Sequence, residues 1–276
     1  MFKILDKKKI NPEVTFMKLQ APHVIENARP GQFVVIKIDE KGERIPLTIV
    51  DKNEEGTISI IFQEVGKTTK ELAALEVGNE VMDVIGPLGR PTHIEKRGRI
   101  ICVGGGVGTA EIYPVAKAFK DAGNEIISVI GARNKDLLLF VDEMKAISSE
   151  TFITTDDGSE ARKGLVTDVL KELLKKEKFD LVYSVGPVLM MRAVAETTRR
   201  YNIKTIVSLN ANMVDATGMC GTCRVKVGGE TKFTCVDGPD FDAHQIDFTE
   251  FINRDRRFKD KEEESLKTYE KRVVQK

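Results

Sequence analysis

Residues 101–114 read ICVGGGVGTAEIYP, an apolar strand pattern that runs through a glycine-rich bend into a helical pattern. Such a strand–loop–helix unit directs backbone N–H groups and the positive end of a helix at a pyrophosphate. The spacing departs from G-x-G-x-x-G/A because Thr109 stands three residues after Gly106, so an ordinary Rossmann site is not supported. A tight turn without a ligand is the alternative. The candidate nucleotide loop comprises Gly104, Gly105, Gly106, Val107, Gly108 and Thr109.

The chain around this loop alternates apolar strand patterns with helical patterns. RIICV, EIISVIG, TFITTDD, DLVYSVG and TIVSLN alternate with segments such as VTDVLKELLKK and VLMMRAVAETTRR. This alternation predicts a parallel sheet covered on both faces, an α/β domain over residues 97–210. YSVGPVLMM (183–191) is a further strand–turn–helix unit, and Gly186 and Pro187 stand at the strand end. Since ligands bind where parallel strands end, this turn supports a nucleotide site at the same edge.

Residues 1–96 alternate short β-rich runs with turn signals, which predicts a small antiparallel barrel interrupted by a helix from Thr68 to Leu75. Two segments are candidates for binding a flavin or a phosphate. Thr48 in RIPLTI (44–49) carries a hydroxyl donor. VGKTTKEL (65–72) can offer amides at a helix start, from Gly66, Lys67, Thr68 and Thr69. A purely structural role for both segments is the alternative.

Residues 211–250 contain three of the four cysteines, in DATGMCGTC and TKFTC. The spacing Asp215-x4-Cys220-x2-Cys223-x11-Cys235 matches the C-x4-C-x2-C…C arrangement of plant-type [2Fe–2S] sites, with Asp215 in the first position. Gly218 and Gly221 would allow the tight loop that such a cluster needs. A dithiol redox pair and a Cys3Asp zinc site are the alternatives. Cys102 lies in the apolar run RIICV and is expected to be a buried structural residue.

Composition narrows the function classes. Lys+Arg and Asp+Glu both number 43, so the formal net charge of zero argues against general binding of nucleic acid or anionic membranes. The N-terminus MFKILDKKKI lacks the apolar core of a signal peptide and no run is long enough to span a bilayer, so a cytoplasmic protein is expected. Residues 251–276 form a charged, weakly helical tail, which we expect to become ordered against a partner subunit; a solvated tail is the alternative.

The motifs together resemble the ferredoxin–NADP reductase superfamily. They resemble more closely the electron-transfer subunit of type B dihydroorotate dehydrogenase, which has counterparts in the same order of RIPLTI, GKTTKEL, GPLG, GGGVGTAEIYP, VGPVLMM and CGTC…CVDGPDFDA. That subunit uses four cysteines, and Asp215 replaces the first of them here. In this respect the chain is similar to the small subunit of NADH-dependent reduced ferredoxin:NADP oxidoreductase. Arg44 departs from the superfamily pattern, which places an arginine where Ile45 stands.

The resemblance implies a flavin-binding barrel, a nucleotide-binding domain and a [2Fe–2S] lobe. FAD would lie along Arg44, Pro46, Leu47, Thr48, Gly66, Lys67, Thr68 and Thr69, and NAD(H) along the glycine loop and Gly186–Pro187. Asp237 and Gly238 would lie near the flavin ring. Hydride exchange with NAD(H) would feed electrons through the cluster to a larger flavin/iron–sulfur subunit, and ferredoxin would react only through that subunit.

Two rival functions remain open at this stage. The chain could serve a type B dihydroorotate dehydrogenase, or it could be a non-catalytic zinc- or cluster-dependent binding module. The sequence also leaves NAD and NADP unresolved. Arg133 could favour a 2′-phosphate, pair with Asp136 or lie in solvent.

Overall fold

The N-terminal part of the chain forms two antiparallel sheets. The computed structural model describes residues 1–53 and 55–274. The sheets have the strand orders β5-β6-β2-β1-β7 and β4-β3-β8. Their elements are β1 (Phe2–Asn11), β2 (Val14–Gln20), α1 (Pro22–Ile25), β3 (Phe33–Lys37), β4 (Arg44–Thr48), β5 (Asp51–Asn53), β6 (Thr57–Gln63), α2 (Lys67–Ala74), β7 (Glu80–Val81) and β8 (Asp83–Leu88). An apolar cluster that includes Ile4, Met17 and Ile58 fills the space between these sheets.

A seven-stranded sheet follows, with the order β12-β11-β10-β9-β13-β14-β17. Its parallel strands are β9 (Arg99–Gly105), β10 (Glu125–Ala132), β11 (Glu150–Thr155), β12 (Arg162–Lys163), β13 (Leu181–Val185) and β14 (Thr205–Ser208). The helical segments between them are α3 (Gly108–Asp121), η1 (Lys135–Leu137), α4 (Val141–Ile147), α5 (Val166–Lys176) and α6 (Val188–Arg199). Separate apolar clusters cover the two faces, one containing α3 and α4 residues and the other α5 and α6 residues. This confirms the predicted fold class.

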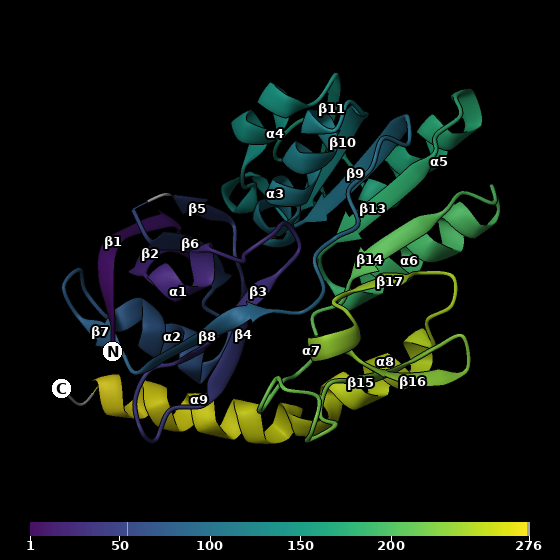
Figure 1. Cartoon of the computed structure of the whole chain (residues 1–276). Helices are drawn as coiled ribbons and strands as arrows, with labels where there is room; N and C mark the ends of the chain where they lie inside the picture. Colours follow the sequence, from purple (N-terminus) through teal and green to yellow (C-terminus); the bar gives the residue numbers. More distant parts are fainter. Residues whose placement is uncertain (54, 275–276) are drawn as a thin grey trace.

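The C-terminal part of the chain contacts both the seven-stranded sheet and the barrel. Its elements are β15 (Arg224–Val227), β16 (Glu230–Phe233), α7 (Thr234–Asp237), β17 (Asp240–Asp242), α8 (Phe248–Asp255), η2 (Arg256–Phe258) and α9 (Lys259–Val274). β17 pairs antiparallel with β14, so the sheet is mixed rather than purely parallel. Cys223 directly precedes the β15–β16 hairpin and Cys235 lies in α7, and these elements pack beside the edge of that sheet (Figure 1).

The charged tail is an ordered helix on its own chain. α9 runs from the cysteine-containing lobe along the barrel (Figure 1), where Lys70 of α2 and Glu270 of α9 form an ion pair of 2.5 Å. None of the side chains in Lys259–Val274 is buried. The tail is thus a helix placed on the barrel of its own chain, and its ordering against a partner subunit stays a prediction.

Candidate functional site

The cysteine loop is a tight coil that brings two thiols together. Cys223 and Cys235 are buried, and their Sγ atoms lie 3.2 Å apart. Cys223 directly precedes β15 and Cys235 lies in α7, so the β15–β16 hairpin returns the chain to its own start. Thr234 closes this return, because its N–H and its hydroxyl donate to the carbonyl of Cys223 at 3.1 and 2.9 Å.

Asp215 lies at the start of the same loop. Its Oδ1 accepts a hydrogen bond from the N–H of Thr217 and its Oδ2 accepts one from the N–H of Cys220, each at 2.9 Å. These bonds, the one from Thr217 foremost, lower the pKa of the Asp215 carboxyl. The left-handed backbone of Gly218 and Gly221, with φ of +83° and +67°, lets the loop turn back between them. The carboxylate therefore fixes the position of Cys220.

The donor set fits an iron–sulfur cluster by its chemistry. Asp215, Cys220 and Cys223 lie in one coil and the hairpin returns Cys235 to it, and soft thiolate ligands suit iron–sulfur clusters. In the part of the chain that the structure describes, no three His, Cys, Asp or Glu residues are gathered tightly enough to hold a metal ion. The fold thus brings Cys223 and Cys235 together and leaves Cys220 exposed at the surface.

The segment after Cys235 ties the cysteine lobe to the barrel. Arg90, just after β8, donates from its backbone N–H to the carbonyl of Gly238 at 2.6 Å and from Nη2 to Asp237 at 3.4 Å. Gly89 has a φ of +75°, and a Cβ there would lie 2.8 Å from Phe33 and 2.9 Å from Pro239. The barrel and the lobe therefore approach so closely at Gly89 that a side chain has no room.

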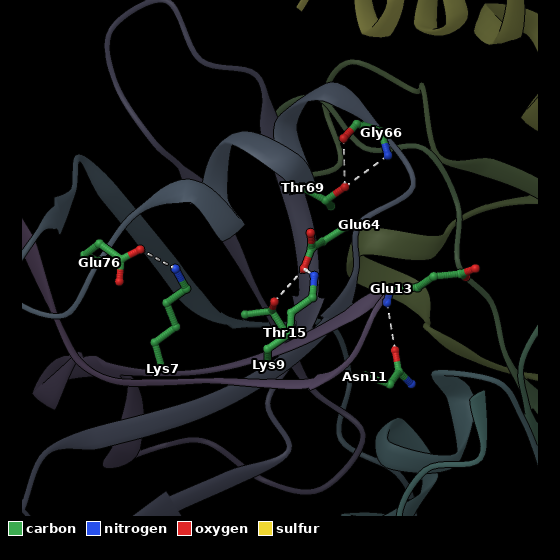
Figure 2. Close-up of polar contacts among 9 residues, drawn as sticks. All are labelled: Lys7, Lys9, Asn11, Glu13, Thr15, Glu64, Gly66, Thr69 and Glu76. Carbon is green, nitrogen blue, oxygen red and sulfur yellow. Dashed lines mark hydrogen bonds and ion pairs between the residues drawn. The ribbon is translucent and has the colours of Figure 1, made fainter. Parts of the chain in front are cut away.

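The candidate flavin residues lie on neighbouring elements of the barrel. Arg44, Pro46, Leu47 and Thr48 belong to β4, and Lys67, Thr68 and Thr69 form the first turn of α2. The Thr69 hydroxyl accepts from the N–H of Gly66 at 3.1 Å and donates to its carbonyl at 3.0 Å, as Figure 2 shows. The buried Thr68 donates to Glu43 at 3.1 Å. A Cβ on Gly66 would meet only Thr69 Oγ1, at 4.0 Å, so this turn is open toward a bound group.

The nucleotide loop combines close packing with one open position. A Cβ on Gly108 would lie 2.4 Å from the carbonyl oxygen of Val185, so only glycine fits between α3 and β13. Gly106 has a φ of +57°, and none of the described residues places a heavy atom within 4 Å of its ideal Cβ. Open space above a glycine is where a pyrophosphate can approach the backbone. The loop therefore fits a nucleotide at Gly106.

Two of the other loop candidates turn inward. Thr109 is fully buried, and a Cβ on Gly104 would lie 2.9 Å from its hydroxyl oxygen. Among the described residues this hydroxyl has no hydrogen-bond partner. Its N–H donates to Gly106 at 3.1 Å. Gly105 and Gly186 pack against each other beneath Met190, whereas Pro187 is exposed. Thr109 and Gly105 thus support the loop from below.

A polar cluster that no sequence motif signals lies where Thr92, Tyr183 and Asp240 meet. The carboxylate of Asp240 in β17 accepts from the hydroxyl of Tyr183 in β13 at 2.8 Å and from that of Thr92 at 2.7 Å. Removal from water raises the pKa of Asp240 to about 6. Asp240 belongs to CVDGPDFDA (235–243), in which Cys235, Asp237 and Gly238 were the predicted site residues. Its polar partners are too distant in sequence to form a recognisable motif.

The comparisons with known proteins agree with this geometry. Residues 102–196 match the family described as the oxidoreductase NAD-binding domain, and residues 210–247 match the iron–sulfur cluster binding domain of dihydroorotate dehydrogenase B. At 21% identity and a TM-score of 0.59, the cytochrome b5 reductase domain of Ulva prolifera nitrate reductase shares the fold over 74% of this chain and 93% of its own.

Fold and site together define an NAD-binding oxidoreductase subunit of the ferredoxin–NADP reductase superfamily, with a flavin and an iron–sulfur cluster as its redox groups. The chain belongs to the family of dihydroorotate dehydrogenase B electron transfer subunits and their homologues. The electron transfer subunit homolog of Thermotoga maritima is 48% identical over 267 residues, which cover 96% of this chain and 94% of the relative. The electron transfer subunit of Fusobacterium nucleatum is 36% identical, over 84% and 92% of the two chains.

A solved structure is similar along almost the whole chain. It is the structure of the NADH-dependent reduced ferredoxin-NADP oxidoreductase, which gave insights into flavin-based electron bifurcation. Its matching chain has 47% identity and a TM-score of 0.92, and the match covers 98% of each chain. In the described residues, no helix is both long and apolar enough to cross a membrane.

Proposed function

We propose that the chain is the small subunit of an electron-bifurcating NADH-dependent reduced ferredoxin:NADP oxidoreductase. The observation that carries the proposal is the extent of the similarity to that enzyme's structure, 98% of both chains, which includes most of the C-terminal helix. The Fusobacterium subunit, by contrast, aligns with 84% of this chain. Asp215 in the first ligand position supports the same assignment, because in this replacement the sequence resembles that subunit rather than the four-cysteine one.

The residues of the chain have separable tasks in this function. FAD held by the barrel would supply hydride exchange with NADH and one-electron transfer to a [2Fe–2S] cluster. The open space at Gly106 would admit the nucleotide pyrophosphate to the glycine loop. The open turn at Gly66 would bind FAD together with β4. Asp215, Cys220, Cys223 and Cys235 would hold the cluster, and the bonds from Arg90 to Asp237 and Gly238 would keep that cluster beside the barrel.

The partner is a larger flavin/iron–sulfur oxidoreductase subunit through which ferredoxin reacts. The test is purification of the chain with its natural partner under anaerobic conditions, followed by mass identification of the partner and analysis of flavin, iron and sulfide. The partner carries flavin and iron–sulfur groups of its own, so the count is made on this chain after separation from the partner, and we expect about one FAD and about two irons. A chain with zinc and no flavin would refute the redox assignment.

A second candidate is the electron transfer subunit of a type B dihydroorotate dehydrogenase. The 48% identity to the Thermotoga maritima homolog and the match over residues 210–247 favour it. The purified complex separates the two candidates. Reduction of NADP by NADH and reduced ferredoxin supports the first, and NAD-dependent oxidation of dihydroorotate supports the second.

A further inference from the structure

We propose that an ion pair between Glu13 of the barrel and Arg133 of the α/β domain makes the nucleotide site select NAD(H) over NADP(H). The inference rests on the nucleotide site of the proposed function. Arg133 directly follows β10, the strand beside β9, and the glycine loop is joined to this strand end by the bond from the N–H of Gly106 to Gly131, 2.9 Å. In dinucleotide-binding α/β units, the group near this strand end meets the adenosine ribose, and an arginine there accommodates a 2′-phosphate.

The side chain of Arg133 is already engaged by the barrel. Its Nη2 lies 2.8 Å from Oε2 of Glu13, in the turn between β1 and β2. The same oxygen accepts a hydrogen bond from Nε2 of Gln63 at 2.7 Å. The backbone of Glu13 is held as well, because its N–H donates to Asn11 at 2.9 Å, drawn in Figure 2, and its carbonyl accepts from the N–H of Glu64 at 2.8 Å. These bonds hold the Glu13 carboxylate beside Arg133, where the barrel meets the α/β domain.

A fixed carboxylate on this arginine acts unequally on the two nucleotides. The 2′-phosphate of NADP(H) must compete with Glu13 for the guanidinium donors and also approach a negative charge. The neutral 2′-hydroxyl of NAD(H) meets no such repulsion. Arg133 is 65% exposed and Glu13 43% exposed, so the ion pair itself adds little to the stability of the fold. The ion pair acts instead through the negative charge of Glu13, which repels the 2′-phosphate of NADP(H). Removal of this charge is expected to raise the affinity for the phosphorylated ligand, relative to the other, about tenfold.

The test measures binding of ADP-ribose and 2′-phospho-ADP-ribose to the FAD-loaded protein by titration calorimetry. In Glu13→Gln, the ratio of the two Kd values should shift about tenfold toward the phosphorylated ligand. The ratio of kcat/KM for NADPH to that for NADH should shift in the same direction. The matched control is Glu55→Gln, which removes an exposed carboxylate from the turn before β6 and should leave both ratios as they are.

The double variant Glu13→Gln/Arg133→Gln identifies the group that makes the difference. If the freed guanidinium of Arg133 causes the shift of the Kd ratio toward the phosphorylated ligand, the double variant does not show this shift. An unchanged ratio in Glu13→Gln, with ADP-ribose still bound, would overturn the role of the ion pair. A protein that retains FAD but binds neither ligand before any substitution would instead overturn the nucleotide site.

Discussion

Replacement of Asp240 by Asn should make the protein less sensitive to pH. The Asp240 carboxyl accepts hydrogen bonds from two hydroxyls in a desolvated junction, and loss of water raises its pKa from 3.8 to about 6. A raised pKa means that folding disfavours the ionised form. The contribution of Asp240 to the stability of the native state is therefore fully present below pH 3.8 and is lost as the pH rises through about 6.

The magnitude follows from the two pKa values. A shift of about 2.2 units corresponds to at most about 3 kcal/mol of lost stability at pH 8. About half of that is already lost at pH 5, where the unfolded chain is ionised and the folded carboxyl is still largely protonated. Between pH 5 and pH 8 the native protein should thus lose up to about 1.4 kcal/mol through Asp240 alone. The side-chain amide introduced by Asp240→Asn cannot ionise, and it can still exchange hydrogen bonds with both hydroxyls.

The assay is thermal unfolding of the cofactor-loaded protein at several pH values between 5 and 8. The difference in Tm between Asp240→Asn and the unaltered protein should grow by roughly 3–5 °C in favour of the variant across this range. Asp142→Asn is the control, since 96% of that side chain is exposed, and its Tm difference should not depend on pH. A Tm difference for Asp240→Asn that stays constant from pH 5 to pH 8 would refute the reasoning.

Three further predictions test the site. Asp215→Cys should keep the cluster and shift its reduction potential, while Asp215→Ala should lower cluster occupancy; an unaltered EPR signal at full occupancy in Asp215→Ala would show that this carboxylate is not a ligand. Gly106→Ala should remain folded, at a cost of about 1–2 kcal/mol for its left-handed backbone, and bind NADH more weakly, whereas Gly108→Ala should unfold at a markedly lower Tm because its Cβ would strike Val185. Truncation after Ile252 should weaken assembly with the partner and leave NADH-to-dye activity; complexes that assemble unchanged would show that α9 serves only its own barrel.

The sequence predicted the strands and helices that carry a strong hydrophobic period. VTDVLKELLKK is α5, and all but the last residue of VLMMRAVAETTRR is α6, since one face of each helix packs on the sheet. β1 was missed, because FKILDKKKIN has mostly polar residues and only Ile4 among them is buried. Its strand structure comes from pairing with β2 and β7, which local periodicity does not report.

The candidate site divides in a similar way. Glycines at tight bends are predictable, because steric exclusion at Gly108 and left-handed backbone at Gly106 leave a local signature. The role of Arg133 was open, because its partner Glu13 lies 120 residues away on another part of the chain. Asp240 was overlooked for the same reason, since its partners Thr92 and Tyr183 come from the linker after the barrel and from the centre of the sheet.

These long-range contacts explain how one chain can keep its redox groups in register. The cysteine lobe has a small two-stranded sheet that is marginal by itself. It is fixed instead by β17, which joins the α/β sheet, and by Arg90, which bonds to Gly238 from the barrel side. Because both anchors lie within a few residues of Cys235, a shift of either domain would move the proposed cluster relative to the flavin. We therefore expect electron transfer between the proposed cluster and the flavin to depend also on Arg90 and on β17.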